Sequence, residues 1–290
     1  MLINKKYLKA LDLWCTEHKD EIHSVEEIRK VEETFEKLIP PYNLETLSIV
    51  DFFGHRYPTW VGTGHLSSLK FLTLKRCESC MCFPPLGHLS HLKFVKILGA
   101  TAVTKIGPEF LGCDVGNPVF AGAVAFPMLE TLILKDMPNW EEWTLAGAEG
   151  EEAIATPRIR LLPRLRHLKI SQCPKLRAIL QQLGLVGMSL KDIEFIDLGS
   201  LKVIENFLFL SERLVIIGCE GLELVSNIPH VGLLFAHYCQ NLSCVEKLDK
   251  LQHLVYTDDM QKMASLWLPG IQQEHKRLHG DDLVVYVCKG

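Results

Sequence analysis

The chain has 290 residues, 48% of them hydrophobic, and its 31 Lys and Arg against 35 Asp and Glu give a net charge of −4. This balance argues against a general affinity for nucleic acid, and no apolar run approaches the roughly 18 to 20 residues needed to span a membrane. Ten cysteines are too few for a disulfide scaffold and no secretory signal pattern is present, so we expect a cytoplasmic protein with reduced thiols.

One pattern, L-x-x-L-x-L with leucine or another apolar residue at each L, recurs along the whole chain. Clear copies are Leu8-Leu11-Leu13, Leu44-Leu47-Ile49, Leu69-Leu72-Leu74, Leu92-Val95-Ile97, Leu129-Leu132-Leu134 and Leu165-Leu168-Ile170. Weaker copies are Leu190-Ile193-Phe195, Ser211-Leu214-Ile216, Val231-Leu234-Ala236 and Leu251-Leu254-Tyr256. A period of about 20 to 25 residues is typical of leucine-rich repeats. The pattern predicts an α/β solenoid: an irregular horseshoe of about ten leucine-rich repeats, with a parallel concave β-sheet and short helices and loops on the convex side.

Each copy alternates apolar and polar residues, which is the pattern of a short strand with one face in the core. The position where the chain leaves the strand holds cysteine in several repeats, namely Cys77, Cys173, Cys219 and Cys239. Repeat proteins use Asn or Cys there to satisfy backbone groups inside the turn. These cysteines therefore indicate the register of the repeats.

The predicted elements follow the chain as one solenoid over residues 1–258 and a C-terminal cap over 259–290. The first repeat begins at Leu8, so we expect an uncapped N-terminal edge. Ser24 and Glu27 form a capping-box pattern that begins a helix at about 25–38. Long steps between repeats predict loops at about 98–128 and 135–164, the second of them acidic and partly mobile. The cap is expected to hold a short helix from Pro269 to His279 and a closing strand at 283–287.

Longer stretches of sequence around these repeats carry a family resemblance. They are the run from Ile39 to Ile49, Phe53 to Trp60, Leu72 to Cys77, Phe83 to Leu89, Ile106 to Gly112, Phe126 to Leu132, Asp136 to Trp143 and Ile170 to Leu176. In this order they resemble the C-terminal leucine-rich-repeat region of plant coiled-coil/nucleotide-binding/leucine-rich-repeat (NLR) disease resistance proteins. The resemblance is strong over about residues 1–180. No G-x-x-x-x-G-K-[ST] phosphate-binding loop occurs, so it implies recognition and autoinhibition but no nucleotide binding by these residues.

Two groups of residues have the spacing of metal ligands. Cys77, Cys80 and Cys82 could share a zinc ion, and His275 and His279 could face one metal from a helix. We interpret the cysteines as core residues and the histidines as solvated ones, because neither group has the further ligands of a known motif. No catalytic motif is recognisable, so we expect no enzyme activity, cofactor or metal.

The side chains that point out of the concave sheet are the candidate protein-binding residues. They are Lys70, Phe71, Lys75, Arg76, Lys93, Phe94, Lys96, Lys135, Arg166, His167 and Lys169. Lys70 and Lys93 are expected side by side on adjacent strands, with Phe71 and Phe94 beside them as an aromatic anchor. Such crowded like charges favour docking of an acidic protein surface. A merely solvated face, or an acidic loop 141–152 folded back over the lysines, would fit the same pattern.

The later repeats present a different, apolar set of outward residues. They are Val215, Ile217, Phe235, His237, Tyr238 and Val255. If these residues are exposed, they form a second contact surface, for an upstream domain or a ligand. A slip of one residue in the register would place them in the core instead.

By resemblance, the chain is a non-catalytic protein-recognition and autoregulatory module of a plant intracellular immune receptor. Its expected partners are an upstream nucleotide-binding domain in cis or in trans and a pathogen effector or guarded host protein, with no nucleic acid and no membrane span. A substrate-recognition repeat domain of a ubiquitin-ligase adaptor, a metal-dependent enzyme and a truncated receptor fragment without activity are the alternatives. The ligand itself is not encoded in the repeat pattern.

Overall fold

The computed structural model describes residues 2–15, 23–112, 124–144, 160–179 and 190–289. The chain forms two compact units, Met1–Pro163 and Arg164–Gly290. The division predicted from the sequence, a solenoid over 1–258 and a cap over 259–290, stays a prediction.

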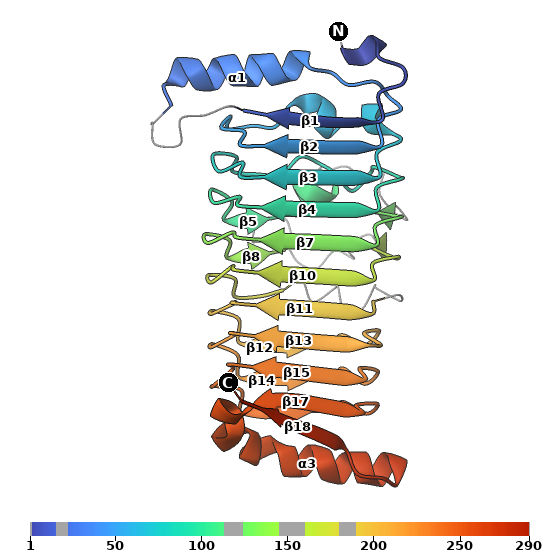
Figure 1. Cartoon of the computed structure of the whole chain (residues 1–290), viewed down its shortest axis with the longest axis vertical. Helices are drawn as coiled ribbons and strands as arrows, with labels where there is room; N and C mark the ends of the chain where they lie inside the picture. The colour runs from blue at the N-terminus through green and yellow to red at the C-terminus, as the bar shows by residue number, and fades with distance from the viewer. Residues whose placement is uncertain (1, 16–22, 113–123, 145–159, 180–189, 290) are drawn as a thin grey trace, which may run out of the picture. The chain divides into compact units, whose positions relative to one another are not determined.

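In the described part of unit 1, five short strands form a parallel sheet in the order β1–β2–β3–β4–β7 (Figure 1). Their bounds are Ala10–Trp14, Thr46–Val50, Phe71–Lys75, Phe94–Leu98 and Thr131–Lys135. Every strand coincides with one predicted leucine frame. The frame residues Leu47, Leu72, Val95 and Leu132 are all 0% exposed, because they face the core while the residues between them face solvent.

Helix α1 (Val25–Lys37) lies beside β1, the first strand of unit 1 (Figure 1). The predicted capping box is present: the Glu27 amide donates to Ser24 Oγ at 3.2 Å, and the Ser24 amide donates to Glu27 Oε2 at 2.7 Å. Phe35, on the buried side of the helix, packs against Phe52 with ring centroids 4.7 Å apart. Short 3-10 helices in this unit are η1 (Leu2–Asn4), η2 (Thr59–Val61), η3 (Gly64–Leu66) and η4 (Pro108–Leu111).

A second set of two- and three-residue strands lies opposite the main sheet in several repeats. In unit 1 these strands are β5 (Lys105–Ile106) with β8 (Glu142–Trp143), and β6 (Val124–Ala125) with β9 (Arg160–Leu161). β5 begins seven residues after β4 ends, and β8 begins seven residues after β7 ends. The segments predicted as loops at 98–128 and 135–164 therefore contain ordered strands at a fixed place in the repeat. Residues 113–123 and 145–159 lie outside the described residues, and with them most of the acidic segment predicted to be mobile.

In unit 2 the described main-sheet strands are β10, β11, β13, β15, β17 and β18, again all parallel. Their bounds are His167–Ser171, Asp192–Ile196, Arg213–Ile217, Leu233–His237, His253–Thr257 and Val284–Cys288. The opposite sheet consists of β12 (Val203–Glu205), β14 (Leu224–Ser226) and β16 (Cys244–Glu246). Leu214, Ile216, Leu234 and Ala236 are 0% exposed, so the register assigned to the later, weaker frames is correct.

The turns after the main strands repeat one backbone conformation. The residue that follows the strand has a positive φ in eight repeats: Asp51, Arg76, Gly99, Asp136, Gln172, Asp197, Gly218 and Tyr238. This left-handed residue redirects the chain so that the next side chain points inward. Cys77, Cys173, Cys219 and Cys239 occupy that next position with 0–1% exposure, as expected from the sequence.

The C-terminal segment differs from the prediction in one respect. Helix α3 runs from Gln261 to His279, after η6 (Asp258–Met260), and Pro269 lies inside it and not at its start. Proline forfeits one hydrogen bond within a helix. The helix nevertheless continues through Pro269 because Trp267 and Ile271, on either side, are buried at 5% and 7% exposure. The closing strand β18 is present and pairs in parallel with β17.

Candidate protein-binding surface

The sheet face of unit 1 consists of the side chains that alternate with the core residues of its main strands. Phe71 pairs with Phe94 in the strand register, and their ring centroids lie 6.4 Å apart at 44°. Phe71 remains 45% exposed although it belongs to a strand with a fully buried inner side. The aromatic anchor expected from the sequence is therefore a tilted pair open to solvent.

The lysines immediately before these strands lie on adjacent strands, as the sequence suggested, and each has an acidic partner. Lys70 and Lys93 are neighbours, since the Lys93 amide donates to the Lys70 carbonyl at 2.9 Å. Lys70 Nζ, however, lies 2.7 Å from Glu45 Oε2, and Lys93 Nζ lies 3.8 Å from Glu130 Oε1. Each lysine is thus balanced by an acidic side chain of the repeat on its other side. These acidic side chains relieve the like-charge crowding that the sequence leads us to expect for Lys70 and Lys93.

Glu45 is the centre of a small ionic cluster. Its carboxylate contacts Lys70, and Lys9 Nζ at 3.0 Å. Hydrogen bonds from Lys70 and then Lys9 lower the pKa of Glu45 from 4.5 to about 2. Arg76 also has an acidic partner within the chain: its Nη2 donates to Asp51 Oδ2 at 2.7 Å, and this hydrogen bonding raises the pKa of the guanidinium.

Three of the lysines predicted to bind a partner protein are not engaged in ion pairs with other described residues. Lys75 and Lys135 flank Leu98 in the register of β3, β4 and β7, and Lys96 lies two residues before Leu98 on the same face. Lys75 and Lys135 are thus about 10 Å apart along the hydrogen-bonding direction. Among the described residues none of the three lysines forms an ion pair. They surround an apolar side chain next to the Phe71–Phe94 pair, which makes this part of the sheet face both basic and apolar.

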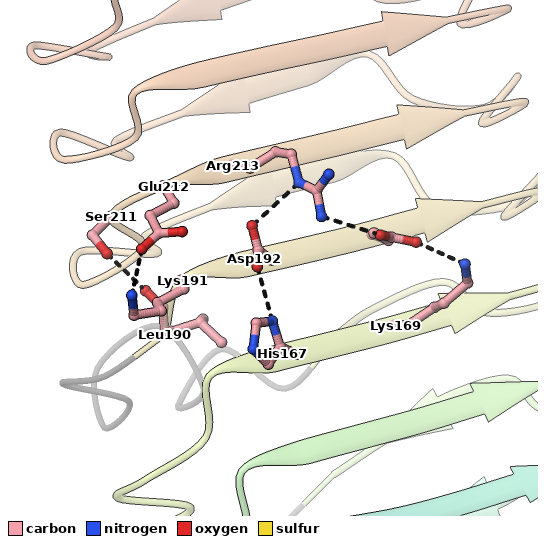
Figure 2. A network of polar contacts seen from close by, with 9 residues as sticks. His167, Lys169, Leu190, Lys191, Asp192, Ser211, Glu212 and Arg213 are labelled. Carbon is pink, nitrogen blue, oxygen red and sulfur yellow. Dashed lines mark hydrogen bonds and ion pairs between the residues drawn. The ribbon is translucent and has the colours of Figure 1, made fainter.

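The corresponding face of unit 2 begins with a charge network that balances itself (Figure 2). His167 Nδ1 lies 2.8 Å from Asp192 Oδ2, and Asp192 Oδ1 lies 3.2 Å from Arg213 Nε. Glu194 connects Arg213 Nη2 at 3.5 Å to Lys169 Nζ at 2.7 Å. The network spans β10, β11 and β13, so it joins three repeats.

With two carboxylates against one lysine and one arginine, this network carries no net charge when His167 is neutral. His167 and Lys169, predicted as docking residues, are therefore engaged within the chain. Arg166 is exposed, and its backbone carbonyl accepts from the amides of Lys191 and Asp192.

Beyond the network, the face of unit 2 becomes apolar, as the sequence predicted. Val215, Phe235, Val255 and Tyr286 are aligned across β13, β15, β17 and β18. The Phe235 and His237 rings stack with centroids 5.5 Å apart, and Tyr238 meets His237 edge-on at 4.4 Å. These side chains are half-buried or exposed, so the alternative in which they belong to the core is excluded.

The acidic partners of Lys70 and Lys93 were not predicted from the sequence, although a pattern in the sequence indicates them. Glu45, Glu130, Lys70 and Lys93 all occupy the position immediately before a main strand. Reading that one position across successive repeats shows acidic residues between the basic ones. Because parallel strands stack in register, such residues pair with their neighbours and not with a ligand.

The possible metal ligands have other roles in the described structure. Cys77 and Cys80 are 1% and 0% exposed, and burial raises the pKa of both thiols, that of Cys77 to about 11. The Cys80 thiol donates to the Gly54 carbonyl at 3.1 Å, as expected for a core cysteine. His279 Nε2 contacts the Asp249 carbonyl at 2.6 Å, and His275 contacts Asp281. Within the described ranges, no three His, Cys, Asp or Glu side chains are arranged to hold a metal ion.

Comparisons with known proteins agree with this architecture. Residues 1–100 match the family model described as R13L1/DRL21 leucine-rich repeats. The chain is 31% identical over 182 residues to RPP13-like protein 1 of Arabidopsis thaliana, a protein named for disease resistance, covering 62% of this chain and 16% of that protein. It is 27% identical over 173 residues to disease resistance protein RGA2 of Solanum bulbocastanum, covering 59% of this chain and 16% of the relative.

The chain spans between 9% and 16% of the length of the curated relatives it matches. Among solved structures, the leucine-rich repeat domain of the type III effector XopL superposes with a TM-score of 0.55 at 17% identity, covering 84% of this chain and 73% of that one. That likeness shows the fold alone. Together these findings confirm the leucine-rich-repeat fold and the resemblance to plant disease resistance proteins. In the described part of the chain, no helix has the length and apolar character needed to span a membrane.

Proposed function

We propose, from the premise that this chain is a leucine-rich-repeat protein similar to plant disease resistance proteins, that it is a protein-recognition and autoregulatory module of a plant immune receptor. It acts in the cytoplasm without catalysing a reaction, and it binds an acidic protein surface through the sheet face of unit 1. Leucine-rich repeats present many parallel side chains on one open face, which suits binding to a macromolecule better than chemistry in a pocket.

One observation carries this proposal: among the described residues, Lys75, Lys96 and Lys135 form no ion pair, whereas the neighbouring Lys70 and Lys93 do. The adjacent repeats pair Lys70 with Glu45 and Lys93 with Glu130, so the chain has the means to balance charge on this face. Three unbalanced lysines around Leu98, beside a half-exposed phenylalanine pair, combine electrostatic attraction with an apolar anchor. That combination is typical of protein interfaces.

The partner is the upstream nucleotide-binding domain, a pathogen effector or a guarded host protein. Autoregulation requires the same face to favour one state of the receptor over another. A ligand releases such a switch only when it binds the active arrangement more tightly than the resting one. Competition between an upstream domain and an effector for the three lysines would satisfy this condition.

The test is co-purification of the full chain with the coiled-coil and nucleotide-binding portion of a relative. A parallel experiment uses candidate effectors expressed at the same level. The Lys75→Glu/Lys96→Glu/Lys135→Glu variant reverses the charge of the proposed site. Exposed charges contribute roughly 0.2–1 kcal/mol each. We therefore expect the variant to bind its partner about tenfold more weakly than the unmodified chain, or weaker still.

The matched control is Lys5→Glu/Lys30→Glu/Lys37→Glu, which changes the net charge equally at exposed positions of the same unit. Equal weakening by both variants would show that net charge alone governs binding and would contradict the proposed site. Retained binding in both variants would place the contact elsewhere in the chain.

A further inference from the structure

A groove lies between the C-terminal helix and the opposite sheet of unit 2, away from the sheet face. Helix α3 packs beside β16, the last strand of the described β12–β14–β16 sheet. Between them is a cavity of about 430 Å³ with Val245 and Leu248 on one side and Trp267 and Ile271 on the other. These four side chains are 3–7% exposed. The Trp267 indole N–H already donates to the Leu242 carbonyl at 2.9 Å, so the groove meets the apolar part of this side chain.

His275 is the polar exception on the buried side of α3. The buried residues of the helix are Ala264, Trp267, Ile271 and His275, spaced three or four apart, so they share one face. His275 is 9% exposed and lines the groove. Its Nδ1 is buried and has no hydrogen-bond partner in the described structure. A buried polar atom left unpaired costs free energy, so this nitrogen marks a position where a partner group fits.

The other ring nitrogen determines what that partner must be. His275 Nε2 lies 3.2 Å from Asp281 Oδ1, whose side chain is 78% exposed. An exposed carboxylate is ionised at neutral pH and only accepts hydrogen bonds, so Nε2 carries the hydrogen. In a neutral imidazole the second nitrogen is then an acceptor. In neutral His275, Nδ1 therefore calls for an O–H or N–H donor from a molecule in the groove that this residue lines.

We propose that this groove binds a small, mainly apolar molecule, of the size of one or two rings, that carries one O–H or N–H group and donates it to His275 Nδ1. A volume of about 430 Å³ lies within the usual range of small-molecule sites. Besides its apolar side chains the lining includes Ser243, Glu246, Lys247, Asp249 and Glu274. Apolar walls with a few oriented polar groups are the common composition of such sites. The groove shares no residue with the three lysines of unit 1, so it goes beyond the proposed function and can succeed or fail independently of it.

Gly270 offers a way to close the groove without damaging the helix. It lines the cavity, and a Cβ built on it meets nothing within 4 Å. Gly270→Leu adds an apolar side chain at this lining position and favours the helix, because leucine has a higher helix propensity than glycine. Gly270→Ala gives nearly the same benefit to the helix and leaves most of the volume open.

The test uses two probes of nearly identical shape, 4-methylphenol and 4-fluorotoluene, of which only the first is a donor. Binding to the full chain is followed by NMR through the Trp267 indole and the His275 imidazole. For 4-methylphenol we expect a Kd on the order of 1 mM, typical of so small a ligand. The fluorinated probe should bind about tenfold more weakly because it leaves Nδ1 unpaired.

The variants separate the alternatives. Gly270→Leu should abolish binding and Gly270→Ala should retain it. His275→Phe should bind both probes with equal affinity, since it keeps a ring and removes the acceptor. Three results would each overturn the proposal. The first is equal binding of the two probes to the unmodified chain, and the second is binding that survives Gly270→Leu. The third is that neither the Trp267 nor the His275 signal shifts at 5 mM probe.

Discussion

The close packing of successive turns makes Gly221 a position where a single methyl group should be costly. Gly221 lies in the turn that follows β13, and a Cβ at this residue would lie 2.2 Å from the Gly199 carbonyl oxygen of the preceding repeat. The contacting atom is backbone, so no side-chain rotation relieves it. An ordinary contact begins at about 3.4 Å, which means that the two turns must separate by about 1 Å. Forced expansion of a packed region costs about 1–3 kcal/mol.

We therefore expect Gly221→Ala to lower the free energy of unfolding by about 3 kcal/mol, toward the upper end of that range. Gly232→Ala is the matched control, because a Cβ there would lie 3.5 Å from the nearest atom, an ordinary contact. Reduced freedom of the unfolded chain should make this control neutral or stabilising by up to about 1 kcal/mol. Urea unfolding of the full chain, followed by circular dichroism, measures both. If Gly221→Ala unfolds at the same urea concentration as the control, the described approach of the turns is refuted.

Further predictions concern the ionic cluster, the thiols and the terminal helix. The pKa of Glu45 is lowered to about 2 by Lys70 and Lys9, so its stabilising contribution is full above its ordinary pKa of 4.5 and is lost as the pH falls toward 2. The difference in Tm between the unmodified chain and Glu45→Gln should accordingly be constant from pH 7 to 5 and vanish near pH 2; a constant difference down to pH 2 would contradict this assignment. Cys82, which is exposed, should react with a thiol reagent at pH 8 in the folded protein, whereas Cys77, whose pKa is raised to about 11 by burial, should react only on unfolding, as peptide mapping would show. Gly270→Ala should raise the free energy of unfolding by about 0.5–1 kcal/mol, measured by urea titration, and a destabilised variant would show that the space beside Gly270 is occupied.

The main strands could be predicted from the sequence because the apolar pattern within each repeat is sufficient to determine which residues face the core. The triplet of apolar residues in Leu69-Leu72-Leu74 has one arrangement that buries all of its members, and Cys77 in the following turn indicates where the strand ends. The same reasoning reached the weakest frames, such as Val231-Leu234-Ala236, where even an alanine is fully buried. Local periodicity was sufficient for this part of the fold.

Features that depend on two repeats at once were harder to predict. The pairing of Lys70 with Glu45 joins residues 25 positions apart, and it becomes visible only when equivalent positions are compared between repeats. The short strands β5 and β8 have two residues each, too few for a periodic signal. The extension of α3 through Pro269 depends on tertiary burial of Trp267 and Ile271, which outweighs a local helix breaker.

The most direct test of the proposed recognition surface is the salt dependence of partner binding. The affinity of the full chain for its co-purifying partner should be measured at 50 and 200 mM NaCl, beside the Lys75→Glu/Lys96→Glu/Lys135→Glu variant. If three unbalanced lysines meet an acidic surface, the unmodified chain should lose affinity severalfold with added salt, and the variant should bind weakly at both concentrations. Equal affinity of the two chains, with the same response to salt, would contradict a recognition role for this face.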